Sequence, residues 1–84
     1  MNKAEKNQYV INKMKNRIEE RGYKGKLEFN PIPNTFKRRN HFTTKADGSG
    51  VFTGFLWQMN CLSDQKLIED IDRRIDEAVL FFKF

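Results

Sequence analysis

The fold is decided between residues 41 and 59, where the chain reads HFTTKADGSGVFTGFLWQM. Asp47, Gly48, Ser49 and Gly50 in its middle are residues that favour tight turns, and glycine tolerates the positive φ angles that such turns require. The flanking residues are rich in β-branched and aromatic side chains, which suit a pleated, half-buried surface. We therefore predict a β-hairpin with strands at 41–46 and 51–59. Gly54 within the second strand predicts a β-bulge or the close approach of a neighbouring ring.

An amphipathic helix precedes the hairpin, over residues 3–21, and Gly22 ends it. Its apolar residues recur at spacings of three and four, which places them on one side of a helix. They are Ala4, Ile11, Met14 and Ile18, with Val10 beside them.

A row of cations lies beside that apolar side: Lys3, Lys6, Lys13, Arg17 and Arg21. Such a row is commonly a solvated flank of the helix. The alternative is a ridge that lies along the phosphates of a nucleic acid.

A short strand and a basic loop connect the helix to the hairpin. Leu27 and Phe29 alternate with polar residues, which indicates a strand, and we expect Pro31 and Pro33 to stop it. Three consecutive cations follow in the loop. Side chains alternate along an extended chain, so one face of the next strand would carry a cationic row with a histidine. The residues that would share this face are Lys37, Arg39, His41, Thr43 and Lys45, and Arg38 is the remaining cation of the loop.

A second amphipathic helix closes the sequence, with Ser63 as its N-terminal cap and an apolar side that reaches Phe82. We expect its charged residues to form a solvent-exposed face with i,i+4 ion pairs, Glu69 with Arg73 and Asp70 with Arg74. The acidic residues expected on that outer face are Glu69, Asp70, Asp72, Asp76 and Glu77. The interleaved arginines argue against a metal site there, and no metal or cofactor is predicted.

These elements predict a single small α+β domain over residues 1–84, in the order αβββα. Both helices would pack on one face of a three-stranded antiparallel sheet, because each amphipathic helix must bury its apolar side. The single Cys61 excludes an intrachain disulfide, and we expect it to be small and buried. We find no apolar run long enough for a membrane span, so we expect a cytoplasmic protein without a membrane partner.

The charge is unevenly distributed along the chain. The net charge is +5, but residues 1–46 hold 12 Lys/Arg against 4 Asp/Glu, whereas residues 47–84 hold 4 against 7. The first half is therefore at +8 and the second at −3. A strongly basic surface indicates a nucleic acid or an acidic protein as the partner.

No catalytic set is evident, since His41 is the only histidine and nothing pairs it with a nucleophile. The order and size of the elements resemble those of the double-stranded RNA-binding domain. In that family the first helix and the loop between the first two strands meet successive minor grooves, places that Lys13, Arg17 and residues 37–39 occupy here. The family's lysine cluster at the start of the last helix is represented by Lys66 alone.

A second, weaker resemblance is to the HicA-type messenger-RNA interferases, which place a catalytic histidine just before a strand and an Asp-Gly turn. Residues 39–42, Arg-Asn-His-Phe, followed by Asp47 and Gly48 are similar to that arrangement. This resemblance implies that His41 would be the catalytic residue of an RNA nuclease; otherwise the sequence offers no catalytic residue.

The sequence thus favours a small non-catalytic nucleic-acid-binding accessory protein that uses the first helix and the basic loop. The residues expected to contact nucleic acid are Lys13, Arg17, Arg21, Lys37, Arg38, Arg39, His41 and Lys45. The main alternative is an inhibitor or adaptor, of the kind mobile elements encode, whose basic face docks on an acidic protein. A homodimer through residues 81–84 is compatible with either function.

Overall fold

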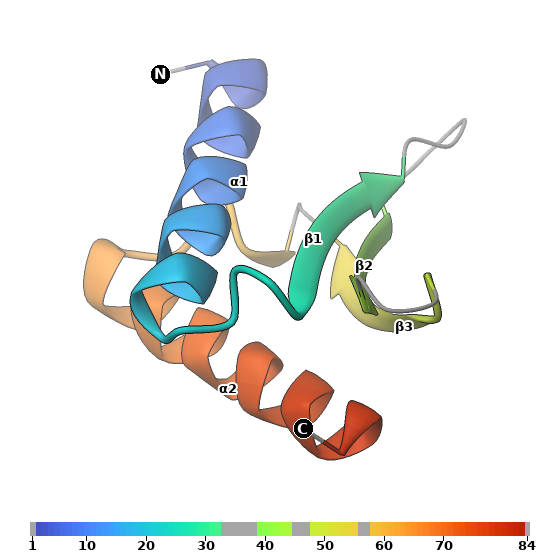
Figure 1. Cartoon of the computed structure of the whole chain (residues 1–84). Helices are drawn as coiled ribbons and strands as arrows, with labels where there is room; N and C mark the ends of the chain where they lie inside the picture. Colours follow the sequence, from blue (N-terminus) through green and yellow to red (C-terminus); the bar gives the residue numbers. More distant parts are fainter. Residues whose placement is uncertain (1, 33–38, 45–47, 56–57, 84) are drawn as a thin grey trace.

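The computed structural model of the chain describes residues 2–32, 39–44, 48–55 and 58–83. Its elements follow the predicted αβββα order, and the α+β class is confirmed (Figure 1). They are α1 (Lys3–Glu20), β1 (Leu27–Ile32), β2 (Arg39–Thr44), β3 (Gly50–Phe55) and α2 (Asp64–Phe82).

Helix α1 begins with a capping box. The Asn2 side chain accepts a hydrogen bond from the Glu5 backbone N–H at 2.9 Å, and the Glu5 carboxylate accepts one from the Asn2 N–H at 3.4 Å. Each bond satisfies a backbone donor that has no partner within the helix. The helix ends where predicted, because Gly22 adopts the positive φ of 83° that turns the chain away from the axis.

The sheet has the order β1-β2-β3, and both strand pairs are antiparallel. Strand β1 continues through Pro31 to Ile32, so the prediction that Pro31 stops it was wrong. The reason is that β1 lies at an edge of the sheet and pairs on one side only. A proline there needs no backbone donor toward a second neighbour.

The predicted hairpin is formed by β2 and β3, both displaced toward the N-terminus relative to the expected bounds. Thr44 N–H donates to the Ser49 carbonyl at 2.9 Å, and Gly48 has the positive φ of 76° expected of a turn glycine. The turn residues 45–47 lie outside the described ranges. Met59, expected at the end of the strand, instead lies in a turn and is fully buried.

Both helices cover one face of the sheet, as predicted (Figure 1). Phe29 of β1 is opposite Phe42 of β2, and their ring centroids are 5.6 Å apart beneath the helices. Burial of this apolar face against two amphipathic helices provides the main favourable free energy of folding. The buried residues are Val10, Ile11, Met14, Ile18, Leu27, Phe29, Phe42, Met59, Leu67, Ile71, Ile75 and Ala78.

Helix α2 is capped by Ser63, whose hydroxyl accepts from the Lys66 N–H at 3.5 Å. Cys61, just before this cap, is exposed, so the expectation of a buried thiol was wrong. The turn from Met59 to Leu62 buries Met59 and leaves Cys61 on its outer side. Within the described ranges, neither helix is both long and apolar enough to cross a membrane.

An arginine of α2 is buried against the middle of β3. The β2–β3 register shifts between Asn40 and His41, which is a β-bulge, and the strand at this point contains Gly54 with a φ of 111°. The guanidinium of Arg74, a residue only 6% exposed, lies so close to Gly54 that a Cβ there would overlap its Nη1 atom. The β-bulge predicted for Gly54 is confirmed, whereas the alternative was wrong, because the group that approaches Gly54 is a guanidinium and not an aromatic ring.

We predict that Gly54→Ala destabilises the chain by about 1–3 kcal/mol, because the methyl group would collide with Arg74 and alanine is strained at this φ. Gly25→Ala is the matched control, since no atom lies within 4 Å of its Cβ position and its φ is ordinary. Urea unfolding of both variants measures the difference. Equal stabilities would show that Arg74 moves aside without cost.

Candidate nucleic-acid interface

The row of cations along α1 divides into two groups in the structure. Arg17 and Arg21, at the C-terminal end of the helix, contact carboxylates of α2. Lys6 and Lys13 contact no carboxylate in the part of the chain that the structure describes. The two arginines therefore join α1 to α2, whereas the two lysines keep a positive charge that no carboxylate of a described residue offsets.

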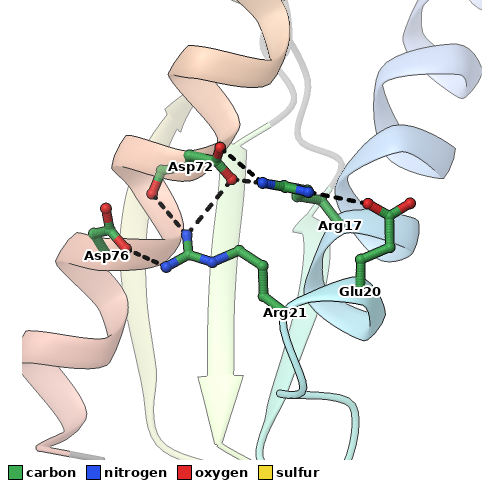
Figure 2. A network of polar contacts seen from close by, with 5 residues as sticks. All are labelled: Arg17, Glu20, Arg21, Asp72 and Asp76. Atoms are coloured by element: carbon green, nitrogen blue, oxygen red, sulfur yellow. Dashed lines mark hydrogen bonds and ion pairs between the residues drawn. The ribbon is translucent and has the colours of Figure 1, made fainter.

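Arg17 is held by a two-pronged interaction with Asp72. Its Nε donates to one carboxylate oxygen at 2.8 Å and its Nη2 donates to the other at 3.2 Å (Figure 2). Its Nη1 donates to Glu20 at 3.1 Å on the same helix. A bidentate arginine–carboxylate pair is strong and fixes orientation as well as charge.

Arg21 joins the same cluster one turn later. Its Nη1 donates to the backbone carbonyl of Asp72 at 3.3 Å, and its Nη2 donates to the carboxylate of Asp76 (Figure 2). The hydrogen bonds from Arg17 lower the pKa of Asp72 below its ordinary value, and the bond to Asp72 raises the pKa of Arg17. The two helices are thus joined by guanidinium–carboxylate contacts.

This cluster corrects the predicted outer face of α2. Asp72 and Asp76 were both expected to face solvent. Asp72 is instead directed toward α1 and is only half-buried between the helices, whereas Asp76 is exposed as expected and also accepts a hydrogen bond from Arg21. Of the expected ion pairs within α2, that of Asp70 with Arg74 is confirmed at 2.6 Å. Arg73 instead contacts Asp70 and Glu77, at 2.7 and 2.9 Å.

Asp70 is the central carboxylate of the second cluster. Its burial is the largest influence on its pKa and acts to raise it, but the hydrogen bonds and charges of Arg74 and Arg73 together outweigh burial. The pKa of Asp70 is consequently below its ordinary value. Arg74 is almost fully buried and depends on this carboxylate for its compensation, because an unpaired buried charge is very costly.

The arginines and the lysines of the described ranges differ in whether they form ion pairs. All four arginines whose side chains are described form ion pairs: Arg17, Arg21, Arg73 and Arg74. Among the eight lysines of the described ranges, Lys24 alone forms one, with Glu19 at 3.6 Å between two exposed side chains. The uncompensated positive charge of the described surface is consequently lysine charge.

Tyr9 lies between Lys6 and Lys13 on α1, at spacings of three and four residues that place all three on one side of the helix. The Tyr9 hydroxyl donates to the Asp64 carboxylate at 2.8 Å, which joins the first half of α1 to the start of α2. The ammonium of Lys13 lies 5.4 Å from the centre of the Tyr9 ring, a cation–π contact. Tyr9 was missed as a site residue, although its spacing from the two lysines was a usable signal.

Two shallow hollows adjoin this group, and Tyr9 lines both. One, of about 210 Å³, lies between Lys13 and Ile68 of α2 and contains the amides of Asn12 and Asn16. The other, of about 230 Å³, contains Lys6 and the segment before α2. We call Lys6, Tyr9, Asn12, Lys13 and Asn16 the α1 lysine face.

The remaining predicted site residues do not join the α1 lysine face. His41 alternates with the buried Phe42 and Thr44, so it lies on the sheet face opposite the helices. On that face the Asn30 amide, opposite His41 on β1, donates to the Thr43 hydroxyl at 2.8 Å. Lys37, Arg38, Lys45 and the Arg39 side chain lie outside the described parts.

Within the described residues no group of three or more His, Cys, Asp or Glu side chains could hold a metal ion. The carboxylates of Asp72 and Asp76 are paired with Arg17 and Arg21 and so are not available to a cation.

Comparison with known proteins identifies no relative of this chain. No protein-family model, no curated protein and no solved structure matches this chain. Function must be argued from the geometry.

We predict that Asp70→Asn costs about 2–3 kcal/mol of stability. This is somewhat less than the roughly 3–5 kcal/mol for a fully buried pair, because the Asp70 side chain is 18% exposed. Urea unfolding measures the loss. Glu69→Gln is the matched control, since Glu69 is an exposed carboxylate of the same helix and forms no ion pair with a described residue. Similar losses in both variants would contradict a special role for Asp70.

The same carboxylates predict how stability depends on pH. Asp70 and Asp72 have lowered pKa values when folded, so their contribution is complete above the ordinary carboxyl pKa of about 4 and is lost as the pH falls below it. Unfolding measured from pH 7 to pH 2 should show this decrease. A double Asp70→Asn/Asp72→Asn variant should show a flatter profile, and an unchanged profile would exclude these two groups as the cause.

Proposed function

We propose that this protein is a small, non-catalytic nucleic-acid-binding accessory protein that acts in the cytoplasm and contacts phosphates through the α1 lysine face. The supporting observation is the division of charges. Four carboxylates of α2, those of Asp70, Asp72, Asp76 and Glu77, are paired with arginines, whereas Lys6 and Lys13 contact no carboxylate of a described residue.

The chemistry of the α1 lysine face suits a phosphate backbone. Lys6 and Lys13 are seven residues apart, which is about 10 Å along a helix, so the two ammonium groups would contact separate phosphates. Amides such as those of Asn12 and Asn16 donate hydrogen bonds to phosphate and sugar oxygens. Binding would be electrostatic and would depend steeply on salt.

Two residues of the predicted set are left out of this proposal. Arg17 and Arg21 would have to break their contacts with Asp72 and Asp76 to reach a phosphate. The cations of residues 37–39 and Lys45 remain candidates, and a contribution from them is part of the proposal.

A nuclease is not favoured by this arrangement. General-base cleavage of RNA would need His41 beside the bound phosphates. His41 lies on the sheet face opposite α1, away from Lys6 and Lys13.

We predict that a Lys6→Ala/Lys13→Ala variant binds labelled duplex RNA, duplex DNA or single strands more weakly than the unchanged chain. Its plot of log affinity against log salt should be shallower by about 0.7–0.9 for each lost phosphate contact. The matched control is Lys15→Ala/Lys26→Ala, which removes the same charge. Lys15 lines a hollow with β1 on the other flank of α1.

Three outcomes are informative. A shallower slope in the first variant and a smaller change in the control would support the α1 lysine face. Equal changes in both variants would show that net charge alone matters. No binding to any nucleic acid at low salt would overturn the proposal, and the basic surface would then be tested as a docking site for an acidic protein.

We predict that the loop and α1 contact the same phosphate backbone. Adding Lys37→Ala/Arg38→Ala/Arg39→Ala to the Lys6→Ala/Lys13→Ala variant should then make the plot of log affinity against log salt still shallower. Additive slopes in a salt titration would support this arrangement. If the triple variant binds like the unchanged chain, the loop makes no contact with nucleic acid. The α1 lysine face would then be the only contact surface that the proposal retains.

A further inference from the structure

A second cation, Arg17, lies in the hollow that contains Lys13. Arg17 lines this hollow of the α1 lysine face together with Lys13 and Asn16. It follows Lys13 by about one helical turn, a rise of about 6 Å, so a phosphate bound beside Lys13 would lie near the Arg17 guanidinium as well. A guanidinium matches a phosphate closely, because its planar fork can donate two parallel hydrogen bonds. Arg17 is therefore placed as a phosphate ligand would be.

Two carboxylates of the protein already occupy the Arg17 guanidinium. Asp72 of α2 accepts hydrogen bonds from Nε and Nη2, at 2.8 and 3.2 Å, and Glu20 of α1 accepts one from Nη1 at 3.1 Å (Figure 2). A carboxylate and a phosphate offer a guanidinium the same kind of acceptor, a pair of anionic oxygens. The hydrogen bonds that Arg17 could donate to a phosphate are thus donated within the protein.

A phosphate from solution competes poorly with Asp72. The fold holds the Asp72 carboxylate beside Arg17, so its effective concentration there is far higher than that of a ligand in solution. The Asp72 side chain is only 31% exposed, and removal of the guanidinium would leave a half-buried carboxylate unpaired, which is costly. The Glu20 side chain is 62% exposed and would lose little. Asp72 is therefore the main competitor and Glu20 the lesser one.

We propose that the contact of Arg17 with Asp72 and Glu20 is autoinhibitory, because these carboxylates take the place of a nucleic-acid phosphate and limit how many phosphates the α1 lysine face engages. The inference rests on the proposed function and concerns the regulation of the same site. In the unchanged chain α1 contacts phosphates through Lys6 and Lys13. Release of Arg17 adds one contact, which raises affinity and salt dependence together.

The labelled RNA and DNA probes and the salt series described above test this proposal with Asp72→Ala. Its plot of log affinity against log salt should be steeper than that of the unchanged chain by about 0.7–0.9, the value for one added phosphate contact. Glu69→Ala is the matched control. It also removes one negative charge from α2, but Glu69 forms no ion pair with a described residue, so no arginine is released.

Arg17→Ala separates the release of Arg17 from the loss of a negative charge. In the unchanged chain this substitution should leave the salt slope nearly the same, because Arg17 contacts no phosphate there. In the Asp72→Ala chain it should return the slope to that of the unchanged chain. A steepening in Asp72→Ala no larger than that in Glu69→Ala, or one that persists without Arg17, would overturn the proposal.

Circular dichroism and thermal unfolding establish whether Asp72→Ala is folded. If it is not, Glu20→Ala takes its place, because Glu20 is exposed and its ion pair lies within α1. A smaller steepening is expected. Its control is Glu19→Ala, which removes the same charge from α1 and releases Lys24 instead of Arg17. Equal slopes in Glu20→Ala and Glu19→Ala would then overturn the proposal.

The outcomes also separate this inference from the proposed function. If the unchanged chain binds through Lys6 and Lys13 and Asp72→Ala shows no steepening, the autoinhibitory contact alone is excluded. If neither chain binds any probe at low salt, both proposals are excluded. Binding by Asp72→Ala alone would support the autoinhibitory contact and contradict the function proposed for the unchanged chain.

Discussion

A three-stranded sheet that buries only one face obliges both helices to share that face, and this constraint governs the positions of the charged residues. Helix α1 and helix α2 lie on the same face of the sheet (Figure 1), and the Phe29–Phe42 pair belongs to the core that they cover. Polar side chains that become partly buried between the two helices then need hydrogen-bond partners on the opposite helix. Arg17 and Asp72 meet this requirement with two parallel hydrogen bonds.

Periodicity allowed most of the fold to be predicted. The apolar spacing in both helices, the turn around Gly48 and the stop at Gly22 reflect local rules that act within a few residues. The extension of β1 through Pro31 could not be predicted in this way, because it depends on β1 being an edge strand, which is a property of the whole sheet.

The candidate site was harder to predict than the fold. A helical wheel places Lys13 and Arg17 in one row, but it contains no information about the neighbouring helix. Once α2 is present, its carboxylates engage Arg17 and Arg21, and the lysines retain their charge toward solvent. Similarly, Asp72 has the spacing of an outward residue of α2, and only the packing of two helices shows that it faces α1.

The separation of guanidinium from ammonium groups has a consequence for covalent chemistry. Acylation of lysines, whether enzymatic or by a reagent, removes positive charge without touching a guanidinium. In this protein such a reaction would discharge the outer surface of α1, while the contacts of Arg17, Arg21 and Arg74 with their carboxylates would persist. Surface charge and structural integrity thus depend on two different functional groups, so the charge of the surface can be altered while the fold is kept.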